Sequence, residues 1–174
     1  MAGFAKRARA IRLAVFDVDG VLTDGTVYMG PQGEALKAFN ILDGHGLKML
    51  HEAGIATAIL SGRKSAMVAT RAKELGLGSV HQGAADKVKV LAGMLKRQRL
   101  TLAACAYMGD DLPDLEVMQS VGVAAAPANA VAAVKKAAHL VTKSRGGSGA
   151  VREFCERLLE ARGRTDLVHG RTKK

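Results

Sequence analysis

Residues 11–24 read IRLAVFDVDGVLTD, a short apolar run with branched side chains that ends in acidic residues and a glycine. The run from Ile11 to Phe16 predicts a buried strand that delivers polar residues at its carboxyl end. Asp17, Asp19 and Gly20 predict a tight loop directly after that strand. Because Gly20 allows a sharp turn, we expect the two carboxylates to occupy different positions and to take different roles.

Apolar runs of the same kind recur along the chain, and a helical pattern follows each of them. The predicted strands cover residues 55–60, 103–108 and 121–125, and the predicted helices cover residues 64–75, 112–121 and 129–138. This alternation predicts an α/β fold, a Rossmann-like, doubly wound and mainly parallel sheet with helices on both faces. In such sheets the ligand site lies beyond the carboxyl ends of the strands, so we expect one pocket to collect their polar residues.

One segment interrupts this alternation and predicts a β-hairpin in place of a cap domain. Residues 26–29 and 34–39 flank a turn of the sequence GPQG, and both flanks suit extended strands. A helical pattern follows, and Asp43 is predicted as its N-cap. That turn would aim backbone N–H groups at an anion.

The length of 174 residues and the apolar share of 48% predict a single domain, with a folded core over about residues 11–162 and a flexible basic tail over residues 163–174. Much of the net charge of +10 lies at the two ends. We interpret these basic residues as solvated tails, because no aromatic residues interleave with them to stack nucleic-acid bases. The basic residues are Lys6, Arg7, Arg9 and Arg12 at one end, and Arg162, Arg164, Arg171, Lys173 and Lys174 at the other.

The first apolar run is too short for a signal-peptide core or a membrane span, so we expect a soluble cytoplasmic protein without a membrane partner. The two cysteines, Cys105 and Cys155, lie far apart in sequence, and no paired spacing accompanies them. They predict reduced core thiols.

The pair Asp17 and Asp19 suits phosphoryl transfer. We interpret Asp17 as a nucleophile that attacks phosphorus and forms an acyl phosphate, which divides one hydrolysis into two easier steps. Asp19 would protonate the leaving oxygen and would then activate water as a base. The two acids alone fit equally well a capped turn with solvated aspartates.

A second acidic group, Gly109 to Asp114, follows another predicted strand. Its three carboxylates repel one another unless a hard cation lies between them, and Mg²⁺ prefers a few carboxylates together with water and phosphate oxygens. We expect Asp110 to bind Mg²⁺ directly with Asp17, and Asp111 and Asp114 to act through water or hydrogen bonds. Helix N-capping, the alternative, accounts for one of the three acids.

Two further features suit a phosphate group. Ser61, Gly62 and Arg63 lie at a strand-to-helix turn, where the hydroxyl and backbone N–H groups can hold phosphoryl oxygens and the guanidinium can reach the substrate. Lys87 opens a helical pattern and would neutralise charge that builds on phosphorus. A single lysine is, however, more often a solvated surface residue.

The order of these motifs resembles the haloacid dehalogenase superfamily, and within it the capless 3-deoxy-D-manno-octulosonate 8-phosphate phosphatase family. The resemblance runs from about Ile11 to Leu159. It rests on FDVDGVLTDG from residue 16, YMGPQGEALKAFN from 28, DGHG from 43, SGRKS from 61, DK from 86, GDDLPD from 109 and RGGSGAVRE from 145. The resemblance implies hydrolysis of this octulosonate phosphate through an aspartyl phosphate, in lipopolysaccharide core biosynthesis.

The resemblance also implies ligands and an assembly. Magnesium would be bound by the Asp17 side chain, the backbone carbonyl of Asp19 and the Asp110 side chain. Hairpins would pair across the subunits of a homotetramer. The small anionic sugar phosphate would contact Asp19, Asn40, Ile41, Leu42, Asp43, Gly44, Lys48, Gly62, Arg63, Arg71 and Lys87. Many relatives carry arginine at the Lys48 position, and lysine lacks its bidentate fork.

Three alternatives differ from this interpretation. The first is a phosphatase for a related keto sugar acid phosphate such as a nonulosonate 9-phosphate, which a substrate panel would separate. The second is a non-catalytic partner domain of a sugar nucleotide transferase. The presence of both Asp17 and Asp19 argues against it. The third is a nucleic-acid binder, for which salt-dependent retention of DNA or RNA is the test. Arg145 or the tail arginines are a further hypothesis for contact with the substrate carboxylate.

Overall fold

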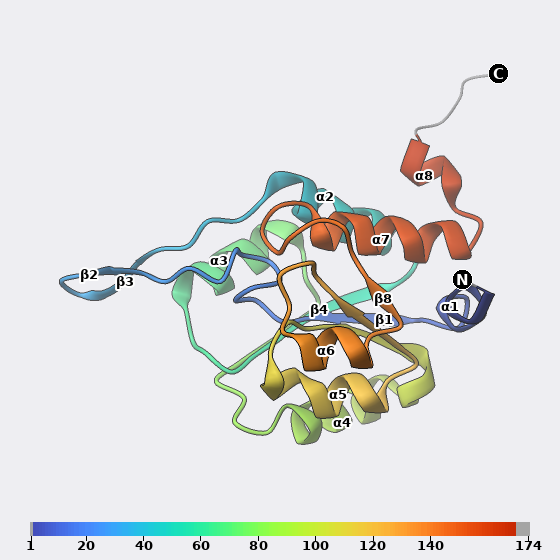
Figure 1. The fold of residues 1–174 in the computed structure, drawn as a ribbon, viewed down its shortest axis with the longest axis horizontal. Coiled ribbons are helices and arrows are strands. Elements are labelled where there is room, and N and C mark those ends of the chain that lie inside the picture. Colours follow the sequence, from blue (N-terminus) through green and yellow to red (C-terminus); the bar gives the residue numbers. More distant parts are fainter. Residues whose placement is uncertain (1, 170–174) are drawn as a thin grey trace.

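The computed structural model describes residues 2–169, and its centre is a six-stranded parallel sheet (Figure 1). The strand order is β5-β4-β1-β6-β7-β8. The strands are β1 Leu13–Phe16, β4 Ala56–Ser61, β5 Ser79–Gln82, β6 Cys105–Met108, β7 Val123–Ala126 and β8 Leu140–Val141. The chain winds outward from β1 in one direction and returns to build the other half, which confirms the predicted doubly wound sheet.

Strand β1 lies between β4 and β6, and Leu13 is in register with Ala56 on one side and Cys105 on the other. All four residues of β1 are buried, because helices cover both faces of the sheet. Strands β5 and β8 were not predicted from the sequence. Strand β5 is half-exposed and polar, and β8 has only two residues, so neither presents an apolar run.

Helices cover the two faces in sets of three (Figure 1). One set is α2 Ile41–Glu52, α3 Ala66–Leu75 and α7 Ala150–Ala161, and the other is α4 Lys87–Gln98, α5 Leu115–Ser120 and α6 Ala132–Ala137. Successive side chains of β1 alternate between two apolar clusters: Ala14 and Phe16 join the first, Leu13 and Val15 the second. Phe16 meets Phe154 of α7 edge-on, with ring centroids 6.1 Å apart.

The predicted hairpin is present as β2 Tyr28–Gly30 and β3 Gly33–Leu36, which pair antiparallel. It projects away from the sheet and its helices (Figure 1). Gly33 closes the turn with φ +106°, a conformation that side chains disfavour. Met29 and Leu36 are 69% and 55% exposed, so the hairpin carries apolar side chains that the described part of the chain leaves uncovered.

The basic residues near the N-terminus are exposed, as predicted, but the segment that carries two of them is a packed helix and not a tail. Helix α1 spans Ala2–Ala8 and packs against the fold through Ala8, which is fully buried, and Phe4. The Arg9 side chain donates from Nε to the carbonyl of Ala161 at the end of α7. Charge counting missed this because an arginine can bind a helix-end carbonyl while its stem covers apolar surface.

The C-terminal segment also differs from the predicted flexible tail. Residues Thr165–His169 form helix α8, and its apolar residues Leu167 and Val168 pack against the core. Arg164 pairs with Asp166 at 3.0 Å. Two apolar residues are too few to produce a visible period in the sequence. The rest of the predicted tail, residues 170–174, lies outside the described residues.

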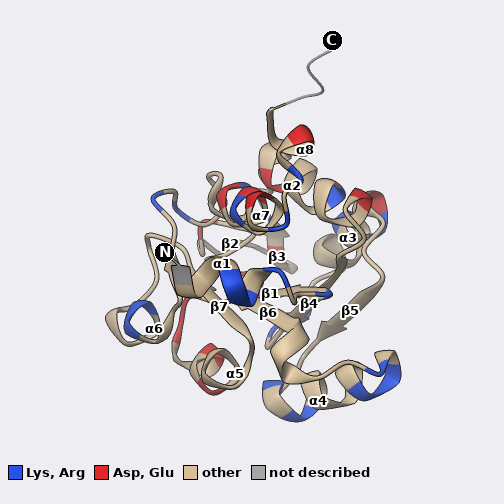
Figure 2. Cartoon of the chain, turned by 90° about the vertical axis from the view of Figure 1, so that its right-hand side faces the viewer, with Lys and Arg blue, Asp and Glu red and all other residues tan. Residues whose placement is uncertain are grey.

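Lysine and arginine are spread over several helices, including α1, α3, α4 and α6 (Figure 2).

Two short 3-10 turns, Leu102–Ala104 and Leu112–Asp114, precede β6 and α5. Within residues 2–169, no helix has both the length and the apolar character needed to cross a bilayer.

Candidate active site

The carboxyl ends of β1, β4 and β6 meet at one edge of the sheet, as predicted, and surround an open cavity of about 300 Å³. Three loops and the start of α4 supply its walls. Its lining residues are Asp17, Asp19, Gly25, Ser61, Gly62, Arg63, Lys87, Asp110, Asp111, Pro113 and Asp114. The four motifs that lie apart in the sequence are therefore brought to one place.

Asp17 follows β1 and is buried at the floor of the cavity. Its backbone N–H donates to the carbonyl of Met108, which continues the sheet ladder by one residue. Its Oδ1 accepts from the backbone N–H of Val18 at 2.7 Å, and its Oδ2 lies 2.9 Å from Lys87 Nζ. Buried Lys87, at the first turn of α4, thus provides the positive charge next to Asp17.

Asp114 is an internal bridge and is almost fully buried. Its Oδ1 accepts from Lys87 Nζ and from the Tyr107 hydroxyl, both at 2.6 Å. Its Oδ2 accepts from the backbone N–H groups of Asp110 at 3.0 Å and Asp111 at 3.4 Å. Both oxygens are therefore occupied, which suits Asp114 to positioning its neighbours rather than to binding a cation.

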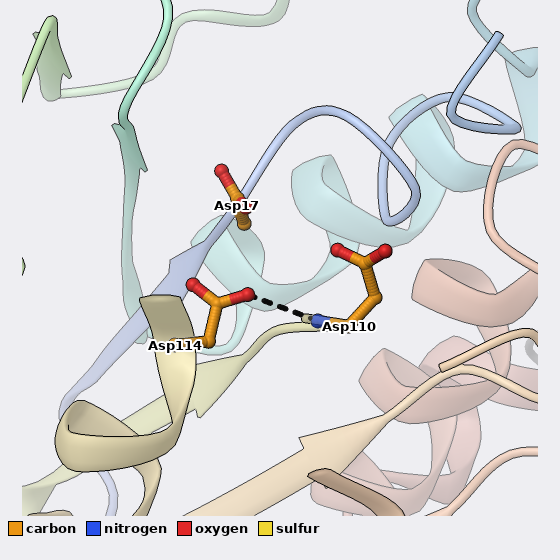
Figure 3. Close-up of side chains that lie close together, drawn as sticks. All are labelled: Asp17, Asp110 and Asp114. Atoms are coloured by element: carbon orange, nitrogen blue, oxygen red, sulfur yellow. Dashed lines mark hydrogen bonds between the residues drawn. The ribbon is translucent and has the colours of Figure 1, made fainter. Parts of the chain in front are cut away.

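Asp110 points its carboxylate toward the loop after β1 (Figure 3). Within residues 2–169 this carboxylate has no hydrogen-bond donor. Gly20, at φ +86°, lies against it: a Cβ at this position would be 2.0 Å from Asp110 Oδ2. The glycine is needed both for the backbone conformation and for the close approach of the two loops.

Oxygen atoms of Asp17, Asp110 and Asp114 lie within 4.8 Å of one another (Figure 3). Burial raises the pKa of Asp17 to about 6, and the charge of Asp114 adds to the rise while Lys87 opposes it. Burial, and then repulsion by Asp17 and Asp114, raises the pKa of Asp110 to about 7. This surplus of negative charge fits a hard divalent cation between Asp17 and Asp110.

Lys87 is charged despite its burial. Burial lowers the pKa of its ammonium group, but attraction to Asp17 and Asp114 outweighs this effect and leaves the pKa raised. A lysine taken alone is more often solvated, whereas its place among the four motifs predicted Lys87 in the site. The structure places the ammonium group between two carboxylates, where it limits their repulsion.

Asp19 faces a second ion-pair network that the sequence analysis missed. Its Oδ1 contacts Lys37 Nζ, and its Oδ2 lies 3.6 Å from Arg63 Nε. Glu34 joins the two cations, at 3.1 Å from Lys37 Nζ and 3.3 Å from Arg63 Nη2. Glu34 and Lys37 come from the hairpin and its exit, which the sequence predicted only as one strand of a β-hairpin.

Asn129 supports the loop after β1 through hydrogen bonds, and the sequence did not indicate this role. Its Nδ2 donates to the carbonyl of Gly20 at 2.9 Å, and its Oδ1 accepts from the N–H of Gly146 at 2.6 Å. Gly146 and Gly147 pack on this loop so closely that a Cβ on Gly146 would lie 1.8 Å from the Gly20 carbonyl oxygen. This glycine segment is therefore part of the packed support of the cavity.

The turn after β4 presents Ser61, Gly62 and Arg63 to the cavity. The Ser61 side chain is buried, and its Oγ accepts weakly from the Arg63 N–H at 3.4 Å. The Arg63 side chain is 52% exposed. A buried hydroxyl and a half-exposed guanidinium thus line the same wall.

Asp43 was predicted as the N-cap of α2, and this prediction is wrong. The side chain of Asn40 caps α2 instead, by accepting from the N–H groups of Leu42 and Asp43. The buried Asp43 carboxylate instead accepts from the N–H groups of Gly149 and Arg152 at the start of α7, at 3.2 and 2.8 Å. Negative charge at a helix N-terminus is favourable, so Asp43 joins α2 to α7.

The remaining residues predicted for substrate contact do not line the Asp17 cavity within this chain. Asn40, Asp43, Gly44 and Arg71 line a small apolar cavity. Ile41, Gly44, Lys48 and Arg71 line an open cleft of about 180 Å³, in which Arg71 pairs with Glu74 at 2.8 Å. Ile41 and Leu42 are 81% and 60% exposed.

Comparison with known proteins places this geometry in a family. A model described as haloacid dehalogenase-like hydrolase matches residues 79–154. The 3-deoxy-D-manno-octulosonate 8-phosphate phosphatase of Escherichia coli K12 is 42% identical over 166 residues, which cover 95% of this chain and 88% of that protein. The chain belongs to this phosphatase family. The resemblance inferred from the motifs is thus confirmed.

Solved members of the octulosonate phosphate phosphatase family share the fold. The Moraxella catarrhalis enzyme, in complex with magnesium, phosphate and the sugar acid, is 40% identical, with a TM-score of 0.95 and coverage of 99% of each chain. The cobalt-bound Haemophilus influenzae enzyme is 37% identical, with a TM-score of 0.89 and coverage of 92% of this chain and 94% of that one.

Proposed function

We propose that this chain is a magnesium-dependent phosphatase that hydrolyses 3-deoxy-D-manno-octulosonate 8-phosphate to the free sugar acid and phosphate, in the cytoplasm and in support of lipopolysaccharide core biosynthesis. The observation that carries the proposal is the meeting of Asp17, Lys87 and Asp110 in one cavity of a family member. Phosphoryl transfer requires little beyond a nucleophile, charge neutralisation and positioning, and this cavity supplies all three.

In the proposed reaction, an oxygen of Asp17 attacks phosphorus and the bond from phosphorus to the sugar oxygen breaks. Asp19 gives its proton to that departing oxygen. A water molecule then attacks phosphorus, its proton passes to Asp19, and the bond to Asp17 breaks to release phosphate. Asp17 suits the first role because its Oδ1 is fixed by the Val18 N–H at the floor of the cavity.

The magnesium ion would be held by Asp17, Asp110 and the backbone carbonyl of Asp19, with Asp111 and Asp114 acting through water or hydrogen bonds. The unsatisfied Asp110 carboxylate and the occupied oxygens of Asp114 support this division. When bound, the ion supplies neutralisation of phosphate charge and orientation of the phosphoryl oxygens.

The other residues that line the cavity would bind the substrate and neutralise its charge. Ser61 and the backbone N–H at Gly62 would bind phosphoryl oxygens, and Lys87 would offset the charge that gathers as phosphorus becomes five-coordinate. Arg63, whose side chain is half-exposed, would contact the substrate beyond the phosphate. The buried ammonium of Lys87, 2.9 Å from Asp17, supports its assignment to the reacting centre.

We propose further that four chains form the active assembly, with hairpins paired across subunits. The exposed apolar side chains of the projecting hairpin support this, because isolated hairpins of this length are only marginally stable. In the assembly, residues 40–44, Lys48 and Arg71 would contact the sugar acid, although their cavities lie apart from Asp17 within one chain.

The test is phosphate release from the octulosonate phosphate, with magnesium, by the wild type and by Asp17→Asn. We expect the substitution to reduce turnover by roughly 10³-fold or more while leaving the fold intact, because the nucleophile is lost. Asp166→Asn, an exposed acid on α8, is the matched control and should remain fully active. A panel that includes a nonulosonate 9-phosphate checks the substrate, and a clear preference for that compound would overturn the proposed substrate.

A further inference from the structure

Lys37, at the exit of the hairpin, is a charged side chain in an enclosed position. Only 2% of its side chain is exposed, and its Nζ contacts Asp19 Oδ1 and lies 3.1 Å from Glu34 Oε1. Burying an ammonium group is costly unless partners compensate it, and these two carboxylates do so. Glu34 lies three residues earlier on the same hairpin, so it can pair with Lys37 without help from the rest of the fold.

The contact with Asp19 is different because it joins the hairpin to the loop after β1. The residues are 18 apart in sequence, and the ammonium group lies on one oxygen of a carboxylate that lines the cavity. A charge-assisted bond of this kind fixes the carboxylate in one rotamer. The other oxygen, Oδ2, is then the one left for a reacting group.

The cation on the Oδ2 side lies farther from Asp19 and is more exposed. Arg63 Nε lies 3.6 Å from Oδ2, beyond good hydrogen-bond distance, and half of its side chain is exposed. Its Nη2 pairs with Glu34 at 3.3 Å, so Arg63 keeps a partner when it leaves Asp19. An arriving anionic substrate can draw this guanidinium away from Asp19 at little cost. Lys37 cannot leave in the same way, because its side chain is enclosed by the hairpin exit and the loop.

We propose that Lys37 is a positioning residue for proton transfer by Asp19: it holds Oδ1 so that Oδ2 faces the oxygen that leaves phosphorus and, later, the attacking water. This inference rests on the proposed phosphatase function. It assigns to the hairpin a role within its own chain, that of orienting the acid and base of the reaction.

The test compares two substrates that differ in their need for an acid. A sugar phosphate has an alkoxide leaving group that must be protonated, whereas the phenolate of p-nitrophenyl phosphate departs without help. The value of kcat/KM reports steps up to the first irreversible one, which is the transfer to Asp17, so it isolates the acid role. The ratio of the two kcat/KM values is independent of the fraction of folded enzyme.

For Lys37→Met we expect kcat/KM for the octulosonate phosphate to fall by about 10²-fold, within the range of general acid catalysis, and that for p-nitrophenyl phosphate by less than about threefold. Lys37→Arg, which keeps a cation on Oδ1, should recover about tenfold or more of the loss. Glu34→Gln leaves the contact with Asp19 in place and should change the ratio less than Lys37→Met. Lys96→Met, an exposed lysine late in α4, is the control.

Equal losses on both substrates would overturn the proposal, because they indicate a general effect on binding or folding. So would an unchanged ratio in Lys37→Met, or a failure of Lys37→Arg to restore the ratio. If instead the wild type released no phosphate from either substrate, the proposed function itself would fail, and the two results are distinguishable in one set of assays.

Discussion

Asp17, Asp110 and Asp114 place three carboxyl groups around a space that contains one buried lysine. Asp114 is compensated by four hydrogen bonds, including those from Lys87 and the hydroxyl of Tyr107. Asp17 and Asp110 are not compensated to the same extent, and their pKa values are raised. The residues at the reacting centre therefore cost stability when ionised, as is common at functional sites.

This cost predicts how the metal-free protein responds to pH. In the folded protein the pKa values of Asp17 and Asp110 are about 6 and about 7, against 3.8 for an ordinary aspartate. The folded state thus holds more protons than the unfolded state between about pH 4 and pH 7, and these groups reduce stability as the pH rises through that window. For Asp17 the loss is about 3 kcal/mol at neutral pH.

The measurement is urea unfolding of chelator-treated wild type and Asp17→Asn at pH 4.5 and 7.5. The stability of Asp17→Asn relative to the wild type should increase with pH, by about 2–3 kcal/mol. Magnesium, which binds the folded wild type, should recover stability at pH 7.5 and have little effect on Asp17→Asn. A relative stability that decreased with pH would contradict the assigned pKa shifts.

At Gly20, a substitution tests the close approach of the two loops. A Cβ at this position would lie 2.0 Å from Asp110 Oδ2, and the residue that carries it would have to adopt φ +86°. We expect Gly20→Ala to displace Asp110, to weaken magnesium binding by at least tenfold and to cost about 1–3 kcal/mol of stability. Gly54→Ala, at φ +74° with open space around it, is the control for conformation alone. Calorimetric titration of magnesium should separate the two variants, and equal affinities would refute the steric explanation.

At the scale of elements, helices α2 and α7 are joined by a buried carboxylate as well as by apolar packing. Asp43 in the first turn of α2 accepts from two N–H groups at the start of α7, and Gly46 lets the helix backbones approach: a Cβ there would lie 3.1 Å from Arg152 Cα. Helix α7 continues from the glycine segment that supports the loop of Gly20. The pairing of these helices thus supports the cavity from a distance.

Asp43→Ala should therefore reduce stability more than removal of an exposed cap. The buried N–H groups of α7 would lose a charged acceptor, which we expect to cost about 2–4 kcal/mol. Asp86→Ala removes the exposed N-cap of α4 and should cost about 1 kcal/mol. Urea unfolding measures both, and a loss for Asp43→Ala no greater than that for Asp86→Ala would show that the α2–α7 bridge contributes little.

At the scale of the whole molecule, the hairpin is the element with least support from its own chain. It pairs only with itself within residues 2–169, and its exposed apolar residues include Tyr28, Met29 and Leu36. Its exit, however, reaches the cavity through Lys37. Association of chains through the hairpin would therefore affect the reacting centre directly.

If four chains assemble through their hairpins as proposed, Met29→Asp should lower the oligomeric state, because a charge would be buried where the hairpins would pair. Light scattering after size-exclusion chromatography measures the mass, and phosphate release measures the effect on activity, which we expect to fall at least tenfold with the mass. Leu102→Asp, at an exposed apolar residue away from the hairpin, is the matched control. An unchanged mass for Met29→Asp would exclude hairpin pairing as the basis of assembly.

The sequence was sufficient for the doubly wound sheet, the hairpin and the motifs around Asp17, Ser61, Lys87 and Asp110. Buried parallel strands are continuous apolar runs, and their carboxyl ends must meet at one edge, so local pattern and topology lead to the same site. Strands β5 and β8 and helix α8 lacked this signal because they are short or half-exposed.

Partnerships between distant residues required the folded chain. Nothing in the local pattern indicated that Lys37 contacts Asp19, that Asn129 binds Gly20 or that the Asp43 carboxylate accepts from the start of α7. Hydrophobic periodicity reports which face of an element is buried, whereas a polar side chain acquires its partner only when two elements meet in space. For this reason the chemistry of the cavity was readable from the chain, and the support that holds it in place was visible only in three dimensions.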